Sequence, residues 1–201
     1  MSTGFKKKFE IILARERRMA NSVAWQVIQP KPFSVWEVLI PVIFILGFIR
    51  SKEQRETFAQ NLMFTKKAAL EAAFAMLNKG RPKEAAMSRI AAETQDLLTA
   101  IPNGVYSDAV RQKQLREIDL LIDHYGRLMQ AEGSDYAALA AAAYQTREDY
   151  MAFQTQLVLA EREVTQAARE TLGSRADHQT AAGIEAAAEK FRQQEIETIY
   201  P

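Results

Sequence analysis

Apolar positions along most of the chain recur at the spacing of α-helices. After residue 50 they repeat at steps of three and four over five ranges, and glycines, prolines or turn residues separate these ranges. No segment alternates with a period of two over more than a few residues, so the pattern predicts no strand. Because the connections are short, we expect an all-α fold, an antiparallel helical bundle of about five helices. The predicted helices are 51–78, 82–101, 106–131, 135–172 and 177–199.

The apolar stripes indicate how these helices pack. In 51–78 two neighbouring stripes make a wide apolar face, which is typical of a central helix. The stripe of 135–172 is narrower and contains Thr146, so a coiled coil between two chains is an alternative for this helix. The stripes include Phe58, Leu62, Ala69, Ala73 and Met76 in the first helix, and Leu139, Ala143, Tyr150, Phe153, Leu157, Ala160 and Val164 in the fourth.

Residues 33–49 form the one long apolar run and are apolar on every helical face. Ser34 and Glu37 are spaced as a capping box at its start, which gives the single charge of the run a local role. A helix over 35–49 would be about 22 Å long, whereas the hydrocarbon core of a bilayer is about 30 Å thick. Pro41 removes one backbone hydrogen bond and predicts a kink in the middle. We therefore expect a short kinked hydrophobic membrane helix.

Three interpretations of this run stay open. It could enter and leave one leaflet, cross the membrane as a short single pass, or lie buried in the core of a soluble domain. No cleavage pattern follows it, so a secretory signal is not expected. Lys and Arg flank both ends in similar number, and this balance favours neither end for export. We expect both flanks to lie on the same, cytoplasmic, membrane face.

Residues 5–28 predict an amphipathic basic helix. Phe5, Phe9, Ile12, Met19 and Val23 form one stripe at steps of three and four if Glu16 is counted as a gap, and basic residues lie mostly off it. Such a helix is typical of the head-group layer of a membrane. Trp25 and Trp36 bracket the entry to the apolar run, as tryptophans do at membrane interfaces. The alternative is an ordinary amphipathic helix that packs on its own domain.

The charge distribution divides the chain in two. Residues 1–67 hold 12 Lys and Arg against 5 Asp and Glu, a net charge of +7, whereas residues 68–201 hold 14 against 20, a net charge of −6. A basic end commonly meets phosphate groups. We therefore expect a membrane-attachment region over 1–50 and an acidic all-helical domain over 51–201. Nucleic acid is not expected as a partner, because no fold that reads grooves accompanies the lysines.

The sequence offers no pattern for catalysis or metal binding. The absence of Cys excludes a thiolate zinc site and a Cys nucleophile. Neither His124 nor His178 completes the Glu-x-x-His motif of a di-iron centre, and the glycine spacing allows no phosphate-binding loop. Asp119 and Asp123 fall one helical turn apart on an edge that we expect to be solvated. We expect no enzyme activity, no metal and no cofactor.

These observations predict a membrane-associated helical adaptor, scaffold or accessory subunit. Its partners would be anionic membrane lipid and another protein, or a second copy of the chain. The alternative is a soluble all-α enzyme or ligand-binding domain with 33–49 in its core. The expected membrane-contacting residues are Phe5, Phe9, Ile12, Trp25, Phe33, Trp36, Leu39, Ile40, Ile43, Phe44, Ile45, Leu46 and Phe48. The expected head-group contacts are Lys6, Lys7, Lys8, Arg15, Arg17, Arg18, Arg50 and Lys52.

Overall fold

A computed structural model describes residues 3–28, 51–100, 106–173 and 178–201. Within these ranges the chain is all-helical, with seven α-helices and no strand, which confirms the predicted fold class. The helices are α1 (Thr3–Val27), α2 (Ser51–Lys79), α3 (Lys83–Ala100), α4 (Asp108–Gln130), α5 (Tyr136–Tyr144), α6 (Arg147–Leu172) and α7 (His178–Ile199).

The predicted single helix over 135–172 is wrong, because the chain breaks at Gln145. This residue has a φ of 58°, a left-handed conformation that ends α5. The side chain of Thr146 then accepts a hydrogen bond from the backbone N–H of Asp149 at 3.1 Å, which caps the start of α6. The part of the bundle after residue 50 therefore has six described helices rather than about five.

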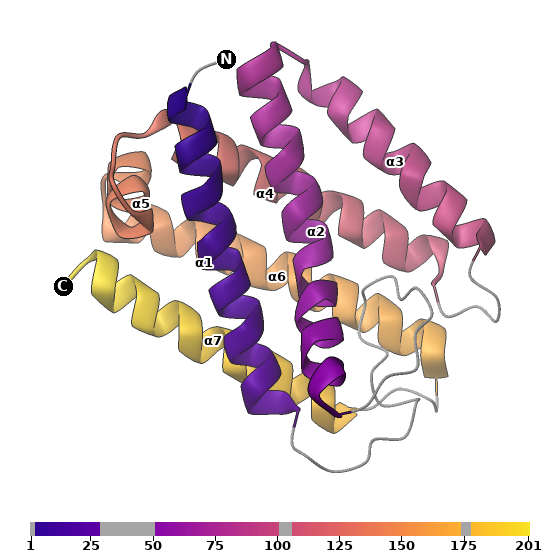
Figure 1. Ribbon diagram of the computed structural model, residues 1–201. Helices are drawn as coiled ribbons and strands as arrows, with labels where there is room; N and C mark the ends of the chain where they lie inside the picture. Colours follow the sequence, from indigo (N-terminus) through magenta and orange to yellow (C-terminus); the bar gives the residue numbers. More distant parts are fainter. Residues whose placement is uncertain (1–2, 29–50, 101–105, 174–177) are drawn as a thin grey trace.

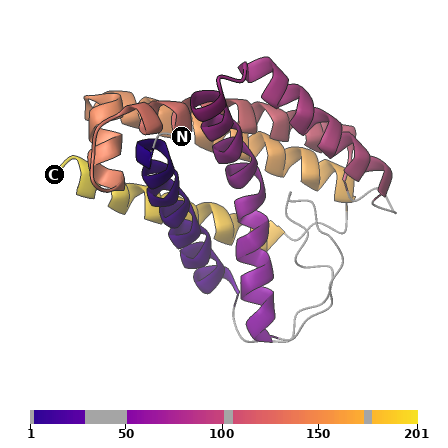
Figure 2. The ribbon, with the colours of Figure 1, turned by 45° about the horizontal axis from the view of Figure 1, so that its top comes forward.

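The helices form two crossing layers (Figure 1). In one layer α1 and α2 lie side by side and antiparallel, and α3 folds back from the end of α2. Behind them α4, α6 and α7 run across in alternating directions, with α5 at one edge. Figures 1 and 2 agree that the last turn of α1 and the first turn of α2 lie at the same end of the molecule.

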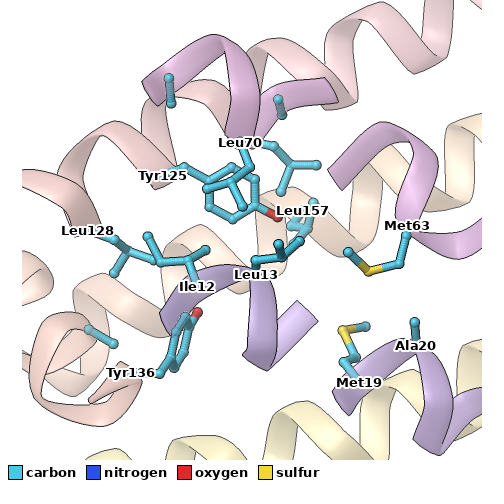
Figure 3. Packing of buried hydrophobic residues seen from close by; sticks show 14 of the residues in the cluster. Ile12, Leu13, Met19, Ala20, Met63, Leu70, Tyr125, Leu128, Tyr136 and Leu157 are labelled. Carbon is cyan, nitrogen blue, oxygen red and sulfur yellow. The ribbon is translucent and has the colours of Figure 1, made fainter. Parts of the chain in front are cut away.

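The main hydrophobic core lies between these layers. Side chains from α1, α2, α4, α5 and α6 converge there, and Figure 3 shows Leu70 beside Tyr125, with Ile12 and Leu13 of α1 close by. Tyr125, Tyr150 and Ile12 are fully buried. α1 therefore belongs to the bundle: the stripe containing Ile12, Met19 and Val23 packs on the chain's own helices. This is the alternative that the sequence left open for residues 5–28.

No helix in the described ranges is both long and apolar enough to cross a bilayer. The apolar run over 33–49 lies outside these ranges, so the expected kinked membrane helix stays a prediction from the sequence.

Gly133 generates a test of how tightly α5 packs on the chain that precedes it. A Cβ atom at this position would lie 2.7 Å from the backbone nitrogen of Leu139 and 2.9 Å from the backbone of Ala138. Since backbone atoms cannot move aside cheaply, we expect Gly133→Ala to lower the free energy of unfolding by about 1–3 kcal/mol. Chemical denaturation monitored by circular dichroism measures this.

The matched control is Gly126→Ala in α4, where an added Cβ would meet nothing within 4 Å. Alanine is favoured over glycine inside helices, so this variant should gain roughly 0.5–1 kcal/mol. Equal effects of the two substitutions would contradict the close approach at Gly133.

Candidate functional site

Charged side chains meet inside the bundle, which is unusual for residues of this type. Arg15 of α1 is 5% exposed, and its guanidinium lies 2.7 Å from a carboxylate oxygen of Glu16 and 2.7 Å from one of Glu195 in α7. Burial alone would raise the pKa of Glu16, but the positive charges of Arg15 and Lys66 outweigh it and hold that pKa below its usual value. Arg15 and Glu16 are therefore both charged in the folded protein.

A second group of charges continues from Glu16 toward α6 and α7. Lys66 of α2 lies 3.8 Å from Glu16 and 3.5 Å from Glu161, and Arg192 of α7 lies 2.5 Å from Glu161. Burial would raise the pKa of Glu161, but Arg192 and Lys66 lower it overall. We call Arg15, Glu16, Lys66, Glu161, Arg192 and Glu195 the buried ion-pair chain; it joins α1, α2, α6 and α7.

Glu117 of α4 differs from the carboxylates of the buried ion-pair chain in its partners and its pKa. It is 6% exposed and accepts a hydrogen bond from the Thr65 hydroxyl at 3.0 Å, but among the described residues it forms no ion pair. Burial and the negative charge of Glu161 raise the pKa of Glu117 to about 7, although Lys66 and Thr65 act in the other direction. A carboxyl group with this pKa exchanges a proton near neutral pH.

Aromatic side chains extend the polar network beyond Arg15. The Tyr150 hydroxyl donates to Glu195 at 2.9 Å, and the hydroxyls of Tyr136 and Tyr150 lie 3.4 Å apart. His124 is buried, stacks on Phe153 with ring centroids 4.0 Å apart, and lies 2.7 Å from the Tyr144 hydroxyl through Nδ1. Burial and the charges of Arg15 and Lys66 lower the pKa of His124, so it is neutral at physiological pH.

A cavity of about 100 Å³ lies next to the buried ion-pair chain. Helices α1, α2, α4, α6 and α7 line it, and its walls are mainly apolar. Met19, Val23 and Ile184 belong to these walls, whereas Glu117 and Lys66 supply polar atoms. A largely apolar space with a few convergent polar groups is the usual form of a small-molecule site.

The structure separates the predicted surface residues of α1 into two groups. Phe5 and Phe9 are half-buried and pack against the core, and Ile12 and Arg15 are buried, so all four contact the chain's own helices. The physical reason is that α1 has one apolar stripe and the other helices cover it. The exposed residues are Lys6, Lys7, Arg17, Arg18 and Trp25, and Lys8 is half-buried with its amine 3.4 Å from Glu132. The side chains of 33–50 and of Lys52 lie outside the description.

Side-chain to backbone hydrogen bonds connect the start of α2 to the end of α1. The Arg55 guanidinium donates two hydrogen bonds to the backbone carbonyl of Ile28, at 3.1 and 3.0 Å. The same group lies 4.0 Å from the ring centre of Trp25, which is 67% exposed. We call this arrangement of Trp25, Ile28 and Arg55 the α1–α2 junction.

Within the described part of the chain, no group of three or more His, Asp or Glu side chains is placed to hold a metal ion. Asp119 and Asp123 lie on the surface, as expected, and both contact the amine of Lys83, at 2.8 and 2.7 Å. Comparisons of the chain with protein-family models, with curated proteins and with solved structures find no match.

The buried ion-pair chain depends on Arg15, and this can be tested. Arg15→Met would leave Glu16 and Glu195 with much less compensating charge, and removing one partner of a buried ion pair costs about 3–5 kcal/mol. We expect the free energy of unfolding, measured by urea titration, to fall by this amount. Arg17→Met, on the exposed side of the same helix, should change it by less than about 0.5 kcal/mol. Similar losses for both variants would contradict a structural role specific to Arg15.

The raised pKa of Glu117 predicts a pH-dependent stability. Between about pH 4.3, where an exposed glutamate titrates, and pH 7 the folded state keeps a proton that the unfolded chain has lost, so stability falls as the pH rises through this range. Glu117→Gln stays neutral, and its stability relative to the unaltered protein should be about 2–3 kcal/mol more favourable at pH 8 than at pH 5. Urea titrations at both pH values measure this difference.

Glu163→Gln is the matched control for this measurement. Glu163 lies on the exposed face of α6, and the hydrogen bond from Lys113 lowers its pKa, so it titrates below pH 5. Its substitution should leave the difference between pH 5 and pH 8 unchanged. The same pH trend in both variants would show that Glu117 is not the group responsible.

Proposed function

We propose that this protein is a membrane-attached helical adaptor or accessory subunit. In this proposal residues 33–49 insert into one leaflet, and the helical bundle lies on the cytoplasmic side, where it binds another protein or a second copy of the chain. Catalytic chemistry is not part of the proposal. The observation that supports it best is the α1–α2 junction.

The α1–α2 junction helps to decide between a segment 33–49 that crosses the membrane and one that returns to the same face. A single pass would separate its two flanks by the thickness of the hydrocarbon core, about 30 Å. Arg55 instead reaches the carbonyl of Ile28 at 3.0 Å, so the chain before the run and the chain after it are held together. This geometry favours a segment that enters and leaves on one face over a segment that crosses the membrane.

The position of Trp25 supports attachment of the bundle to the membrane at the end where α1 stops and α2 starts. Trp25 lies at the end of the molecule where α1 stops and α2 starts, and tryptophan is enriched at membrane interfaces. The lysines at 6, 7 and 8 lie about 20 residues earlier in the same helix, or about 30 Å away along its axis. This exceeds the Debye length of about 8 Å at physiological salt. Trp25 and Arg55 are therefore better placed than Lys6–Lys8 to meet head groups in this orientation.

The surface of α6 supports a partner-binding role. Met151 and Leu159 are two helical turns apart and are 44% and 56% exposed. With Trp25 they are the large apolar side chains that stand exposed among the described residues. These two exposed apolar side chains mark α6 as the helix on which we place the binding face of the bundle.

Cysteine accessibility in intact cells tests the topology. The chain contains no native Cys, so Gly4→Cys and Thr198→Cys each introduce a single thiol, both at exposed positions. We expect both variants to fractionate with membranes after a high-salt wash, because apolar insertion resists salt. Both thiols should resist an impermeant maleimide in intact cells and react after lysis.

Two outcomes would contradict the proposal. Labelling of only one of the two thiols in intact cells would establish a single pass. Recovery of the full-length protein in the soluble fraction without detergent would instead favour the soluble all-α alternative. A variant lacking 33–49 is the control, because it should lose the salt-resistant part of the membrane association.

A further inference from the structure

The cavity beside the buried ion-pair chain combines apolar walls with the buried carboxyl group of Glu117, which forms no ion pair in the described structure. Met19 and Val23 from α1 and Ile184 and Ala188 from α7 give one side of the space its apolar surface. Glu117 lines the same space from α4, and the Thr65 hydroxyl donates a hydrogen bond to one of its carboxylate oxygens. A ligand that fits here needs an apolar body and one polar end.

The ion pairs that the cavity-lining residues already form indicate the charge of that polar end. Lys66 contacts Glu16 and Glu161, Arg192 contacts Glu161, and Arg162 lies 3.7 Å from Glu185. Each basic group of the lining thus has a carboxylate within 4 Å. Glu117 is the buried carboxyl group of the lining that has no such counter-charge in the described structure. An anionic ligand would compete with existing partners for the cations, whereas a cationic ligand would find Glu117 available.

The charge balance of the interior around the cavity also favours a cation. The buried ion-pair chain holds three basic residues, Arg15, Lys66 and Arg192, and three glutamates, and Glu117 adds a fourth carboxyl group beside it. With Glu117 ionised this interior group therefore carries one excess negative charge. A buried charge is costly unless it is paired, so one positive charge in the cavity would offset this excess.

We propose that this cavity binds a small organic monocation, a primary ammonium group on a short alkyl chain, with Glu117 as the residue that accepts the ammonium. The volume limits the size of the ligand, since a cavity of about 150 Å³ holds benzene and this one measures about 100 Å³. A chain of roughly four carbon atoms fits that limit. The proposal is independent of the membrane attachment argued above.

Three compounds with the same chain and different head groups test the assignment: n-butylamine, n-butanol and butyrate. Isothermal titration calorimetry with the full-length protein at pH 8 should show n-butylamine binding at least tenfold more tightly than either of the others. Lowering the pH to 5.5 should weaken n-butylamine about tenfold or more, because the pKa of Glu117, set among Thr65, Lys66, Glu161 and Arg192, is about 7.

Substitutions separate recognition by Glu117 from a general charge effect. Glu117→Gln should weaken n-butylamine at least tenfold, whereas Glu185→Gln removes the same charge from the lining and should weaken it less than threefold. Ala188→Leu keeps Glu117 but fills the cavity, and it should also abolish binding. Circular dichroism of each variant verifies that it is folded.

Several results would overturn the proposal. These are an n-butylamine affinity no higher than that of n-butanol, tighter binding of butyrate, or equal losses in the Glu117 and Glu185 variants. Unchanged binding by folded Ala188→Leu protein would place the ligand elsewhere and would also overturn it. Absence of binding by all three compounds at millimolar concentration has the same consequence.

Discussion

The arrangement of the bundle depends on the buried guanidinium of Arg15. A positive charge at 5% exposure needs counter-charges, and here Glu16 on the same helix and Glu195 on α7 provide them. This requirement fixes how α7 lies against α1, since apolar contacts alone would tolerate small shifts along the helix axes. Tyr150 also donates to Glu195, so α6 is positioned by the same carboxylate. One ionic group thereby relates α1 to α6 and α7, which are distant from it in sequence.

Three carboxyl groups of this region, those of Glu16, Glu117 and Glu161, show that burial does not by itself decide protonation. Burial raises the pKa of each, yet Glu16 and Glu161 end below the usual value and Glu117 ends near 7. The difference is the distance to a cation: the first two have guanidinium or ammonium nitrogens within 4 Å, whereas Glu117 has a hydroxyl. The same helix packing that pairs most charges leaves one carboxyl group facing a largely apolar space. This is why the cavity and the ion-pair chain have to be considered together.

Helix positions were predictable from the sequence, because each helix buries one periodic apolar stripe. The break at Gln145 was not, since the Ala-rich stripe continues across it, although Thr146 followed by Glu148 and Asp149 is a helix-start signal. Two of the buried charges could be noticed in the sequence, because Glu16 and Lys66 each fill a gap in the apolar stripe of their helix. A gap does not reveal the partner, because Glu195 is 180 residues from Arg15. The inward orientation of α1 and the cavity needed the three-dimensional arrangement.

That separation of 180 residues has a consequence for how the protein is made. A ribosome adds roughly 5–20 residues per second, so Arg15 waits on the order of 10–40 s for Glu195 to be synthesised. During this time α1 carries a charged side chain that belongs in the interior, and the apolar run over 33–49 is translated well before Glu195. Of the helices described, α7 is translated last, and it completes the packing of α1. The order of synthesis thus leaves an interval in which Arg15 lacks one of the two carboxylates that compensate its charge in the completed bundle.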